Sequence, residues 1–237
     1  MNIALILSGG TGTRLGESMP KQYIDAGGRM IITYCLETLA GHEEIDAVQI
    51  VADPLWQEAI LKEAALHNVA PGKLFGFSKP GENRQQSIFH GLQDIKEYAG
   101  RDDLVLIHDA ARPLLSKEQI ADCLAAACGH DGAMPVLPMK DTVYFSNDGQ
   151  HVSNLLDRSS IFAGQAPEVF SFGTYYEANL RLLPDKILSI NGSTEAAILM
   201  GLDIVMVPGD EANFKITMQN DLKRFQQIVK DREERDK

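Results

Sequence analysis

Short apolar runs alternate with stretches of helical periodicity along much of the chain. The runs, bounded by polar or turn-forming residues, have the pattern of strands buried on both faces of a sheet. They cover residues 3–7, 47–52, 74–77, 104–107 and 133–137. Apolar residues recur every three or four positions over residues 30–39, 54–67, 84–98 and 117–128. This alternation predicts right-handed βαβ crossovers and an α/β fold with a doubly wound, Rossmann-like, mostly parallel sheet.

The pattern changes between Lys140 and Arg158, where two β-rich segments flank Asn147-Asp148-Gly149. These turn residues tolerate positive φ and favour a hairpin. A lone two-stranded hairpin is marginal in water, so it needs a surface to pack on. We therefore expect a protruding β-arm over about residues 140–165, and a homodimer in which each arm contacts the partner subunit.

The rest of the chain returns to the helix and strand pattern. We expect helices over residues 173–182 and 193–200, a strand over 204–207 and an amphipathic helix over 219–231, followed by a frayed, charged end at 230–237. The sequence contains no repeat, low-complexity segment or linker composition. A single domain, residues 1–237 with its arm, is therefore the expected organisation.

Composition limits the partners that the surface can serve. The net charge is −11, from 22 basic and 33 acidic residues, which argues against a broad surface for nucleic acid or an anionic membrane. No apolar run approaches the roughly 18 residues of a membrane helix, and no signal peptide is recognisable. Cys35, Cys123 and Cys128 have neither disulfide nor zinc spacing. We expect a cytoplasmic protein whose basic residues converge in a pocket.

A glycine-rich loop, residues 8–16, directly follows the first predicted strand. Successive backbone N–H groups in such a turn can bind an anion, and ligands of open α/β sheets bind beyond the carboxyl ends of strands. A dinucleotide fingerprint would require a small residue in place of Leu15 and an acidic residue nearer than Asp53, and an ATPase loop would require Lys-Ser or Lys-Thr. These mismatches disfavour a dehydrogenase and an ATPase, and leave another phosphate loop or a tight turn.

Charged residues beside turns add chemistry to this loop. Arg14 and Lys21 flank it, and fixed cations of this kind stabilise the charge that nucleotidyl transfer builds on phosphates. Asp109 follows a predicted strand and is suited either to Mg²⁺ or to capping a helix. Arg112 can hold a phosphate with two hydrogen bonds. His108 is expected to be a packed histidine at the strand end.

Short motifs around these residues resemble those of one enzyme family. The run Gly-Gly-Thr-Gly-Thr-Arg-Leu-Gly followed by Pro20-Lys21-Gln22 is similar to the opening of the sugar-nucleotide-type pyrophosphorylases. Within them the chain most resembles the family of 2-C-methyl-D-erythritol 4-phosphate and ribitol-5-phosphate cytidylyltransferases. The further matching motifs are Gly81-Glu82-Asn83-Arg84 with Ser87, the HDAARP segment 108–113, Asp141-Thr142, Asp157-Arg158 and the NFKIT segment 213–217.

The resemblance implies a CTP-dependent cytidylyltransferase that uses Mg²⁺ and a small phosphorylated acceptor. The acceptor phosphate would attack the α-phosphorus in line, without a general base. The implied catalytic cations are Arg14, Lys21 and Lys215. The implied CTP-binding residues are Ser8, Gly9, Gly10, Gly12, Thr13, Gly81, Glu82, Ser87 and Ala110. The implied acceptor-binding residues are Asp109, which would also bind the metal, Arg112, Thr142, Ser193 and Arg158 of the partner subunit.

The sequence departs from the family pattern on the acceptor side. Relatives have Thr-Pro-Gln where this chain has Ala166-Pro167-Glu168, and often Thr-Asp-Glu where it has Ser193-Thr194-Glu195. A hydroxyl and a carboxylate are thus missing from the acceptor side. On the nucleotide side, the choice of CTP over UTP rests on the resemblance alone. The favoured acceptor is 2-C-methyl-D-erythritol 4-phosphate, a step of isoprenoid-precursor synthesis. Ribitol 5-phosphate or a related polyol phosphate is the alternative, and a non-catalytic nucleotide-binding domain is a third possibility.

Overall fold

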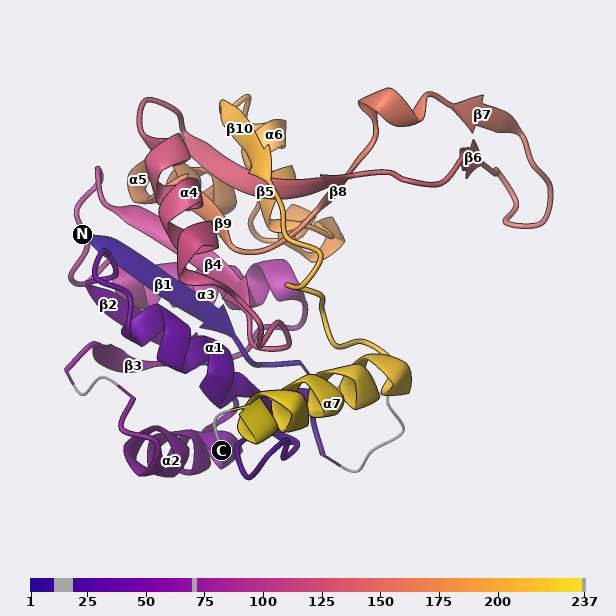
Figure 1. Ribbon diagram of the computed structural model, residues 1–237. Coiled ribbons are helices and arrows are strands. Elements are labelled where there is room, and N and C mark those ends of the chain that lie inside the picture. The colour runs from indigo at the N-terminus through magenta and orange to yellow at the C-terminus, as the bar shows by residue number, and fades with distance from the viewer. Residues whose placement is uncertain (11–18, 70–71, 236–237) are drawn as a thin grey trace.

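A mostly parallel sheet forms the centre of the molecule. The computed structural model describes residues 1–10, 19–69 and 72–235. The sheet has eight strands in the order β10-β5-β9-β4-β1-β2-β3, with β8 paired to β5 (Figure 1). The strands are β1 (Asn2–Leu7), β2 (Ala47–Val51), β3 (Leu74–Ser78), β4 (Leu104–Asp109), β5 (Gly132–Pro138), β8 (Phe162–Gly164), β9 (Glu168–Ser171) and β10 (Ile204–Pro208). The predicted α/β class is confirmed.

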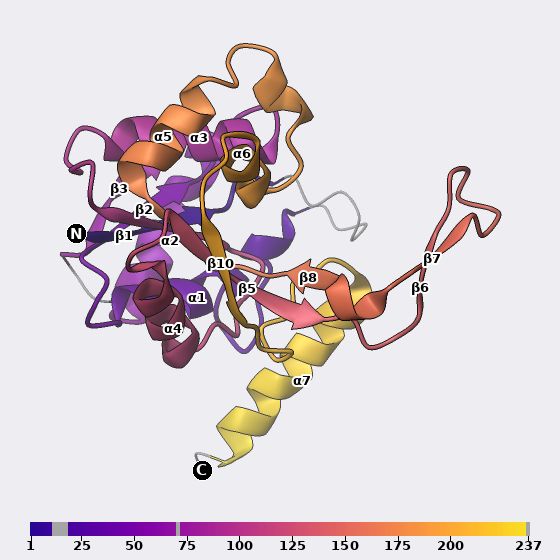
Figure 2. The same ribbon diagram turned by 90° about the horizontal axis from the view of Figure 1, so that it is seen from above.

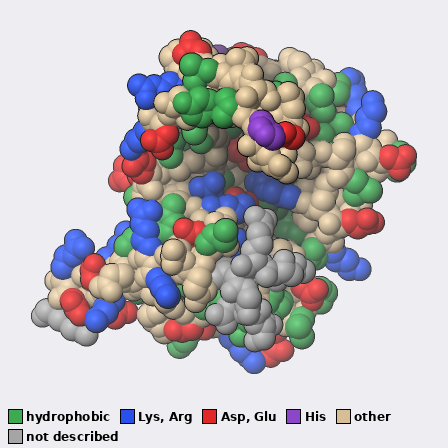
Figure 3. All heavy atoms as spheres, turned by 90° about the vertical axis from the view of Figure 1, so that its right-hand side faces the viewer, with side chains coloured by type: hydrophobic (Ala, Val, Ile, Leu, Met, Phe, Trp, Pro, Cys, Tyr) green, Lys and Arg blue, Asp and Glu red, His purple; other side chains and the backbone are tan. Residues whose placement is uncertain are grey.

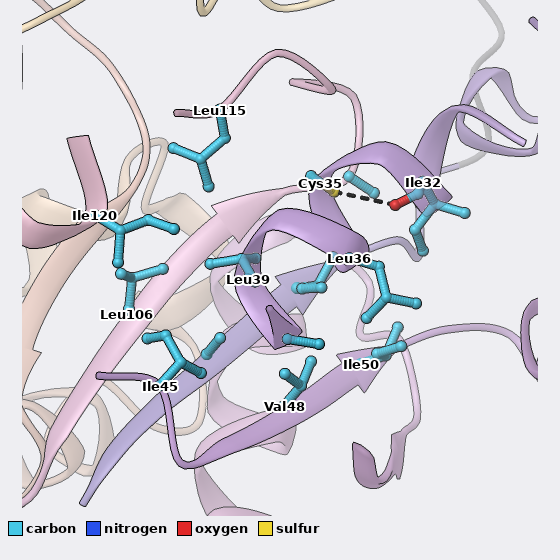
Figure 4. Packing of buried hydrophobic residues seen from close by; sticks show 14 of the residues in the cluster. Ile32, Cys35, Leu36, Leu39, Ile45, Val48, Ile50, Leu106, Leu115 and Ile120 are labelled. Atoms are coloured by element: carbon cyan, nitrogen blue, oxygen red, sulfur yellow. Dashed lines mark hydrogen bonds between the residues drawn. The ribbon is translucent and has the colours of Figure 1, made fainter. Parts of the chain in front are cut away.

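Helices cover both faces of the sheet, as Figure 2 shows from above. The buried centre of β1, residues 3–6, explains why. Ala4 and Ile6 pack with α1 and α4 on one face, and Ile3 and Leu5 pack with α3, α5 and α6 on the other. Figure 4 shows the packing on the α1 face. The helices are α1 (Ile31–Ala40), α2 (Pro54–Leu66), α3 (Arg84–Ile95), α4 (Lys117–Ala127), α5 (Phe172–Leu180), α6 (Ser193–Leu199) and α7 (Gln219–Arg235). Within the described ranges, none of them is long and apolar enough to cross a membrane.

The C-terminal helix α7 is longer than the sequence pattern predicts. Its apolar face buries Leu222, Phe225 and Val229 against the start of α1. The expected fraying from residue 230 is wrong as far as Arg235, because the last described turn still forms helical contacts. The Arg235 side chain donates to the Asp231 carbonyl at 3.2 Å. Val229 is the last buried residue of α7, and the helix continues beyond it through residues 230–235, which are exposed or half-buried.

Strand β9 was not predicted, yet it determines how the site is built. It is short, begins with a charged residue and lies antiparallel between β4 and β5. Four residues with a mixed pattern give too weak a period-2 signal to distinguish a strand from a loop. The register pairs Glu168 with Ile107, two residues before Asp109. A carboxylate of β9 therefore lies at the same end of the sheet as the end of β4.

Residues 139–161 leave the sheet after β5 and carry a second, two-stranded sheet of β6 (Val143–Phe145) and β7 (Asn154–Leu156). Both ribbon views show this segment extending away from the body of the molecule (Figures 1 and 2). The turn is held by the Asp148 carboxylate, which accepts backbone N–H bonds from Gln150 and His151 at 2.9 and 2.8 Å. Large apolar side chains, including Tyr144 and Leu155, are exposed on it.

Candidate active site

A cavity of about 720 Å³ opens at the carboxyl ends of β1 and β4. Its described lining comes from the residues after β1, the start of α3, the end of β4, and segments 21–22 and 215–217. Figure 3 shows Lys and Arg side chains gathered at this hollow. The position is the one where open α/β sheets bind ligands. Of the predicted residues, Gly12, Thr13 and Arg14 lie outside the described ranges.

The loop after β1 is fixed by Gln22, which belongs to the Pro20-Lys21-Gln22 motif but was not among the predicted site residues. Its buried amide Nε2 donates to the carbonyls of Ser8 and Gly10 at 2.7 and 2.8 Å. Gly9 lies so close to the loop after β3 that a Cβ there would be 2.7 Å from the Cβ of Pro80. Gly9 and Gly10 line the cavity with backbone alone. A phosphate or base edge can thus approach the main chain directly.

Two predicted CTP residues hold the loop in place and do not line the cavity. The Ser8 backbone N–H donates to Val51, and its carbonyl accepts from the Gln22 amide and the Tyr23 hydroxyl. The Ala110 backbone N–H donates to the Leu7 carbonyl at 3.1 Å. Because these backbone groups already have partners, Ser8 and Ala110 position the strand ends on which the cavity is built.

The loop before α3 forms the second wall of the cavity. The Asn83 side chain caps the helix by accepting from the Gln86 backbone N–H at 2.8 Å. The Ser87 hydroxyl accepts from the Gly81 backbone N–H at 2.9 Å and donates to the Asn83 carbonyl at 2.8 Å. A Cβ on Gly81 would lie 2.6 Å from Gln86. Gly81, Glu82 and Ser87 line the cavity in one closely packed turn, and their binding of CTP stays a prediction.

Asp109, the last residue of β4, is the centre of charge in the site. Its Oδ2 lies 2.9 Å from Lys215 Nζ and 3.5 Å from Arg112 Nε, and its Oδ1 lies 3.3 Å from Arg84 Nε. Burial alone would raise the pKa of this carboxyl, but Arg84, Lys215 and Arg112 hold it well below its usual range. Asp109 is therefore ionised and organises three cations from three separate segments.

Lys21 and Arg112 connect the same region to the segment before α7. Lys21 begins the short 3-10 helix η2 (Lys21–Tyr23), and its Nζ donates to the Ile216 carbonyl at 2.5 Å. Arg112 Nη1 donates to the Asn213 carbonyl at 2.7 Å. Lys21 and Lys215 line the cavity, whereas Arg112 is absent from its described lining. Two of the three predicted catalytic cations, Lys21 and Lys215, thus line the described part of the cavity.

The remaining predicted acceptor residues lie apart from the cavity lining. Thr142 and Arg158 are on the arm, where Arg158 Nη1 donates to the Lys140 carbonyl at 2.7 Å. Ser193 is fully buried, and its hydroxyl contacts Arg84 and Glu168. Within one described chain, no arm residue reaches the cavity lining, so a role for the arm would need a second subunit.

Arg84 and Glu168 are site residues to which the sequence analysis assigned no role. Arg84 lines the cavity at the first turn of α3, and its guanidinium lies between the carboxylates of Asp109 and Glu168. Arg84 stands in a matching motif, and Glu168 stands at a position where the sequence departs from the family pattern. Their roles depend on contacts between segments more than 80 residues apart, which short motifs do not reveal.

Asp109 was also predicted as a metal ligand. Among the described residues, no group of three or more His, Cys, Asp or Glu side chains could hold a metal ion. Asp109 is one hard carboxylate facing the cavity, and Mg²⁺ commonly needs only one or two carboxylates beside substrate phosphates. The residues thus fit a metal ion that binds mainly to phosphates, and a cage made of protein ligands alone is absent from the described part of the chain.

His108 precedes Asp109 in β4, and its titration links the stability of the folded protein to pH. It is fully buried, and its Nε2 lies 3.0 Å from the Arg112 carbonyl. Burial lowers the pKa of this imidazole from 6.5 to about 4. As pH falls from 6.5 to about 4, His108 becomes protonated in the unfolded chain but stays neutral in the folded protein. The free energy of unfolding therefore decreases over that pH range.

We expect His108→Gln to reduce this pH dependence by about 2–3 kcal/mol, since one pKa unit corresponds to about 1.36 kcal/mol. Urea unfolding of both proteins at pH 7.5 and pH 4.5 measures it. The variant should be less stable at pH 7.5 but lose less on acidification. An equal loss in both proteins would mean that His108 does not cause the sensitivity.

Comparison with known proteins shows the family to which this chain is similar. A family model described as IspD: 2-C-methyl-D-erythritol 4-phosphate cytidylyltransferase matches residues 2–231. A protein of that name from Thermotoga neapolitana is 32% identical over 98% of both chains. Ribitol-5-phosphate cytidylyltransferase of Streptococcus agalactiae serotype Ia is 31% identical over 98% of this chain and 97% of its own.

Two further comparisons concern length and fold. The bifunctional enzyme IspD/IspF of Paramagnetospirillum magneticum is 33% identical over 94% of this chain, which spans 55% of that protein's length. The solved structure of 4-diphosphocytidyl-2C-methyl-D-erythritol synthase from Anaerococcus prevotii superposes with a TM-score of 0.81 at 23% identity, over 97% of this chain and 96% of its own. That likeness shows the shared fold.

Proposed function

Because this chain belongs to the 2-C-methyl-D-erythritol 4-phosphate cytidylyltransferase family, we propose that it transfers CMP from CTP to 2-C-methyl-D-erythritol 4-phosphate and releases pyrophosphate. It is an enzyme of the CTP-dependent nucleotidyltransferase class. The observation that carries the proposal is the cavity in which glycine backbone at the end of β1 faces Lys21, Lys215 and Asp109. A non-catalytic binding domain would have no need for so many cations around one carboxylate.

CTP lies, in this proposal, between the glycine loop after β1 and the wall formed by Gly81, Glu82 and Ser87. Backbone N–H and C=O groups at Gly9 and Gly10 are close enough to the cavity to read the small cytosine edge. The phosphates then extend toward Lys21 and Lys215, the cations that line the cavity. Asp109 would be the protein ligand of a Mg²⁺ ion, which would supply further positive charge beside these phosphates.

The chemistry needs charge neutralisation and alignment more than proton transfer. An oxygen of the acceptor phosphate, already an anion, forms a bond to the α-phosphorus of CTP as the bond to the β-phosphate bridging oxygen breaks and pyrophosphate leaves. Lys21 and Lys215 stabilise the charge that develops on the α-phosphate and the leaving group. Arg14 is assigned the same task by the resemblance. Asp109 keeps Lys215 oriented through their 2.9 Å ion pair.

Nucleotide binding tests the first half of the proposal. A ligand that binds only the folded protein adds about 2.7 kcal/mol at 100 times its Kd. Thermal unfolding with CTP, UTP and NAD, each with Mg²⁺, should show the largest increase in Tm for CTP. An increase with NAD alone would indicate a dehydrogenase, and equal increases with CTP and UTP would remove the base selectivity from the proposal.

The acceptor is tested by comparing the two polyol phosphates. Ala166 is buried beside Asn213, whose amide donates to the Ala166 carbonyl at 2.7 Å, and it offers no hydroxyl. A site without a hydrogen-bond partner separates near-isosteric substrates by only about 100-fold. We expect measurable kcat/KM with both 2-C-methyl-D-erythritol 4-phosphate and ribitol 5-phosphate, the first being higher, and a wider gap in Ala166→Thr. Preference for ribitol 5-phosphate would select the second candidate, which the Streptococcus agalactiae relative supports.

We also propose that the arm completes the site of a partner subunit in a homodimer. The arm's exposed apolar side chains need a surface to pack on, and Thr142 and Arg158 lie away from the cavity of their own chain. Mixing Arg158→Ala with Lys21→Ala subunits should recover roughly a quarter of wild-type activity, because roughly half of random dimers are mixed and one of their two sites is intact. Activity no greater than that of either parent would rule out action across the interface.

A further inference from the structure

Glu168 is a buried carboxylate at the start of β9 that no step of the proposed reaction uses. The residue is 8% exposed. Its Oε2 lies 3.4 Å from Arg84 Nη2 and accepts from the Ser193 hydroxyl, while its Oε1 accepts from the Thr194 hydroxyl at 2.8 Å. A buried charge is costly unless it is paired and hydrogen-bonded, and both oxygens of Glu168 are. The carboxylate therefore belongs to a completed network.

That network reaches the centre of the site through Arg84. The guanidinium donates through Nε to Asp109 at 3.3 Å and through Nη1 to the Ser193 hydroxyl, and contacts Glu168 through Nη2. A guanidinium stays charged in proteins, and this one lies between the carboxylates of Asp109 and Glu168. Arg84 is therefore a charged bridge between a carboxylate that faces the cavity and one behind it.

We propose that Glu168 is a positioning residue for CMP transfer, holding Arg84 so that Asp109 stays oriented toward Lys215 and the acceptor. This inference rests on the proposed function. With a neutral residue at 168, Arg84 would keep only one carboxylate partner and could turn toward Asp109 or the cavity. Either movement displaces the Asp109 carboxylate, and misplacement of about 1 Å can cost 100-fold in rate.

The contact between Glu168 and Thr194 gives this proposal a second line of support. These are two of the positions where the sequence departs from the family pattern, Gln being replaced by Glu at 168 and Asp by Thr at 194. Their side chains touch, at 2.8 Å between Oε1 and Oγ1. Relative to that pattern, the one carboxylate of this contact stands at 168 instead of 194. In this proposal the two changes compensate for each other, because the contact keeps a single negative charge.

A double-mutant cycle tests this compensation. The proteins are wild type, Glu168→Gln, Thr194→Asp and the double variant. Glu168→Gln removes the negative charge, and Thr194→Asp places two carboxylates in contact, where one is disfavoured. We expect each single variant to lower kcat/KM for the acceptor about 10-fold, mainly through KM, and the double variant to return within about 3-fold of wild type instead of losing about 100-fold.

Controls separate positioning from a general loss of structure. Glu177 lies on α5 and forms an exposed ion pair with Arg101. Glu177→Gln removes its charge and should leave kcat/KM unchanged. The increase in Tm caused by CTP should be preserved in all variants, because Glu168 does not line the cavity. Multiplicative losses in the double variant, or a Glu168→Gln variant with wild-type KM for the acceptor, would overturn the proposal.

The cycle also remains informative if the reaction itself has been misassigned. Absence of turnover by the wild type with every polyol phosphate would contradict the proposed function, but thermal unfolding would still test the coupling of the two positions. In the unfolding experiments, the double variant should have a higher Tm than either single variant, because one negative charge is restored to the contact. Equal or additive decreases in Tm would show that the two positions are not coupled.

Discussion

Lys21→Ala is expected to lower kcat at least about 100-fold while the protein remains folded. Loss of one preorganised group that stabilises transition-state charge typically costs about 10²–10³ in kcat. Lys21 meets the structural conditions for such a group. It lines the cavity, follows the rigid Pro20, and its Nζ is placed by a 2.5 Å hydrogen bond to the Ile216 carbonyl. Steady-state turnover at saturating CTP and acceptor measures the effect.

Two control variants test whether the loss of activity is caused by loss of the charge at position 21. Lys62→Ala removes a lysine whose side chain is 74% exposed on α2, and it should have wild-type kcat. Lys21→Arg keeps the charge and should retain more activity than Lys21→Ala. A folded Lys21→Ala variant with near-normal kcat would remove Lys21 from the mechanism.

Asp109→Asn is expected to lower kcat/KM for the acceptor about 1000-fold and to destabilise the protein. Removing one partner of a buried ion pair typically costs about 3–5 kcal/mol, because the remaining charge is left buried without compensation. Here Arg84, Arg112 and Lys215 would all lose the same counter-charge. Their mutual repulsion should displace Lys215 from the α-phosphate of bound CTP.

Kinetics and urea unfolding of the same preparation distinguish the two effects. Asp122→Asn, an exposed substitution on α4, is the matched control and should behave as wild type. CTP phosphates can partly replace the missing negative charge, so the increase in Tm on adding CTP should be at least as large in Asp109→Asn as in wild type. Wild-type stability together with kcat/KM within 10-fold of wild type would contradict the central role of Asp109.

The parallel part of the sheet was predictable because each strand there is a continuous apolar run. Residues 3–7 bury side chains on both faces, so the pattern leaves little choice of structure. Strand β9 escaped prediction because it is short and takes its place from pairing with β4 and β5, which are distant in sequence. The end of α7 escaped for a different reason, because residues 230–235 continue the helix beyond its last buried residue, Val229, without an apolar pattern of their own.

The candidate site also contains residues that the sequence could predict and contacts that it could not. Lys21, Gly81, Ser87, Asp109 and Lys215 stand in short motifs, and the structure brings them to one cavity. No local pattern shows that Ser193 is buried behind Arg84, or that the substitutions at 168 and 194 are in contact. Such contacts depend on the packing of α3, β9 and α6. A sequence can therefore suggest the chemistry of a site while the support around its residues remains hidden.

The most direct test is the release of pyrophosphate from CTP and Mg²⁺ on addition of 2-C-methyl-D-erythritol 4-phosphate, with the cytidylylated product identified by mass. We predict pyrophosphate and product in equal amounts, none without the acceptor, and a much lower rate with UTP. Lack of acceptor-dependent release with CTP, in protein that CTP stabilises against unfolding, would contradict the assignment of this cavity to CMP transfer onto that acceptor.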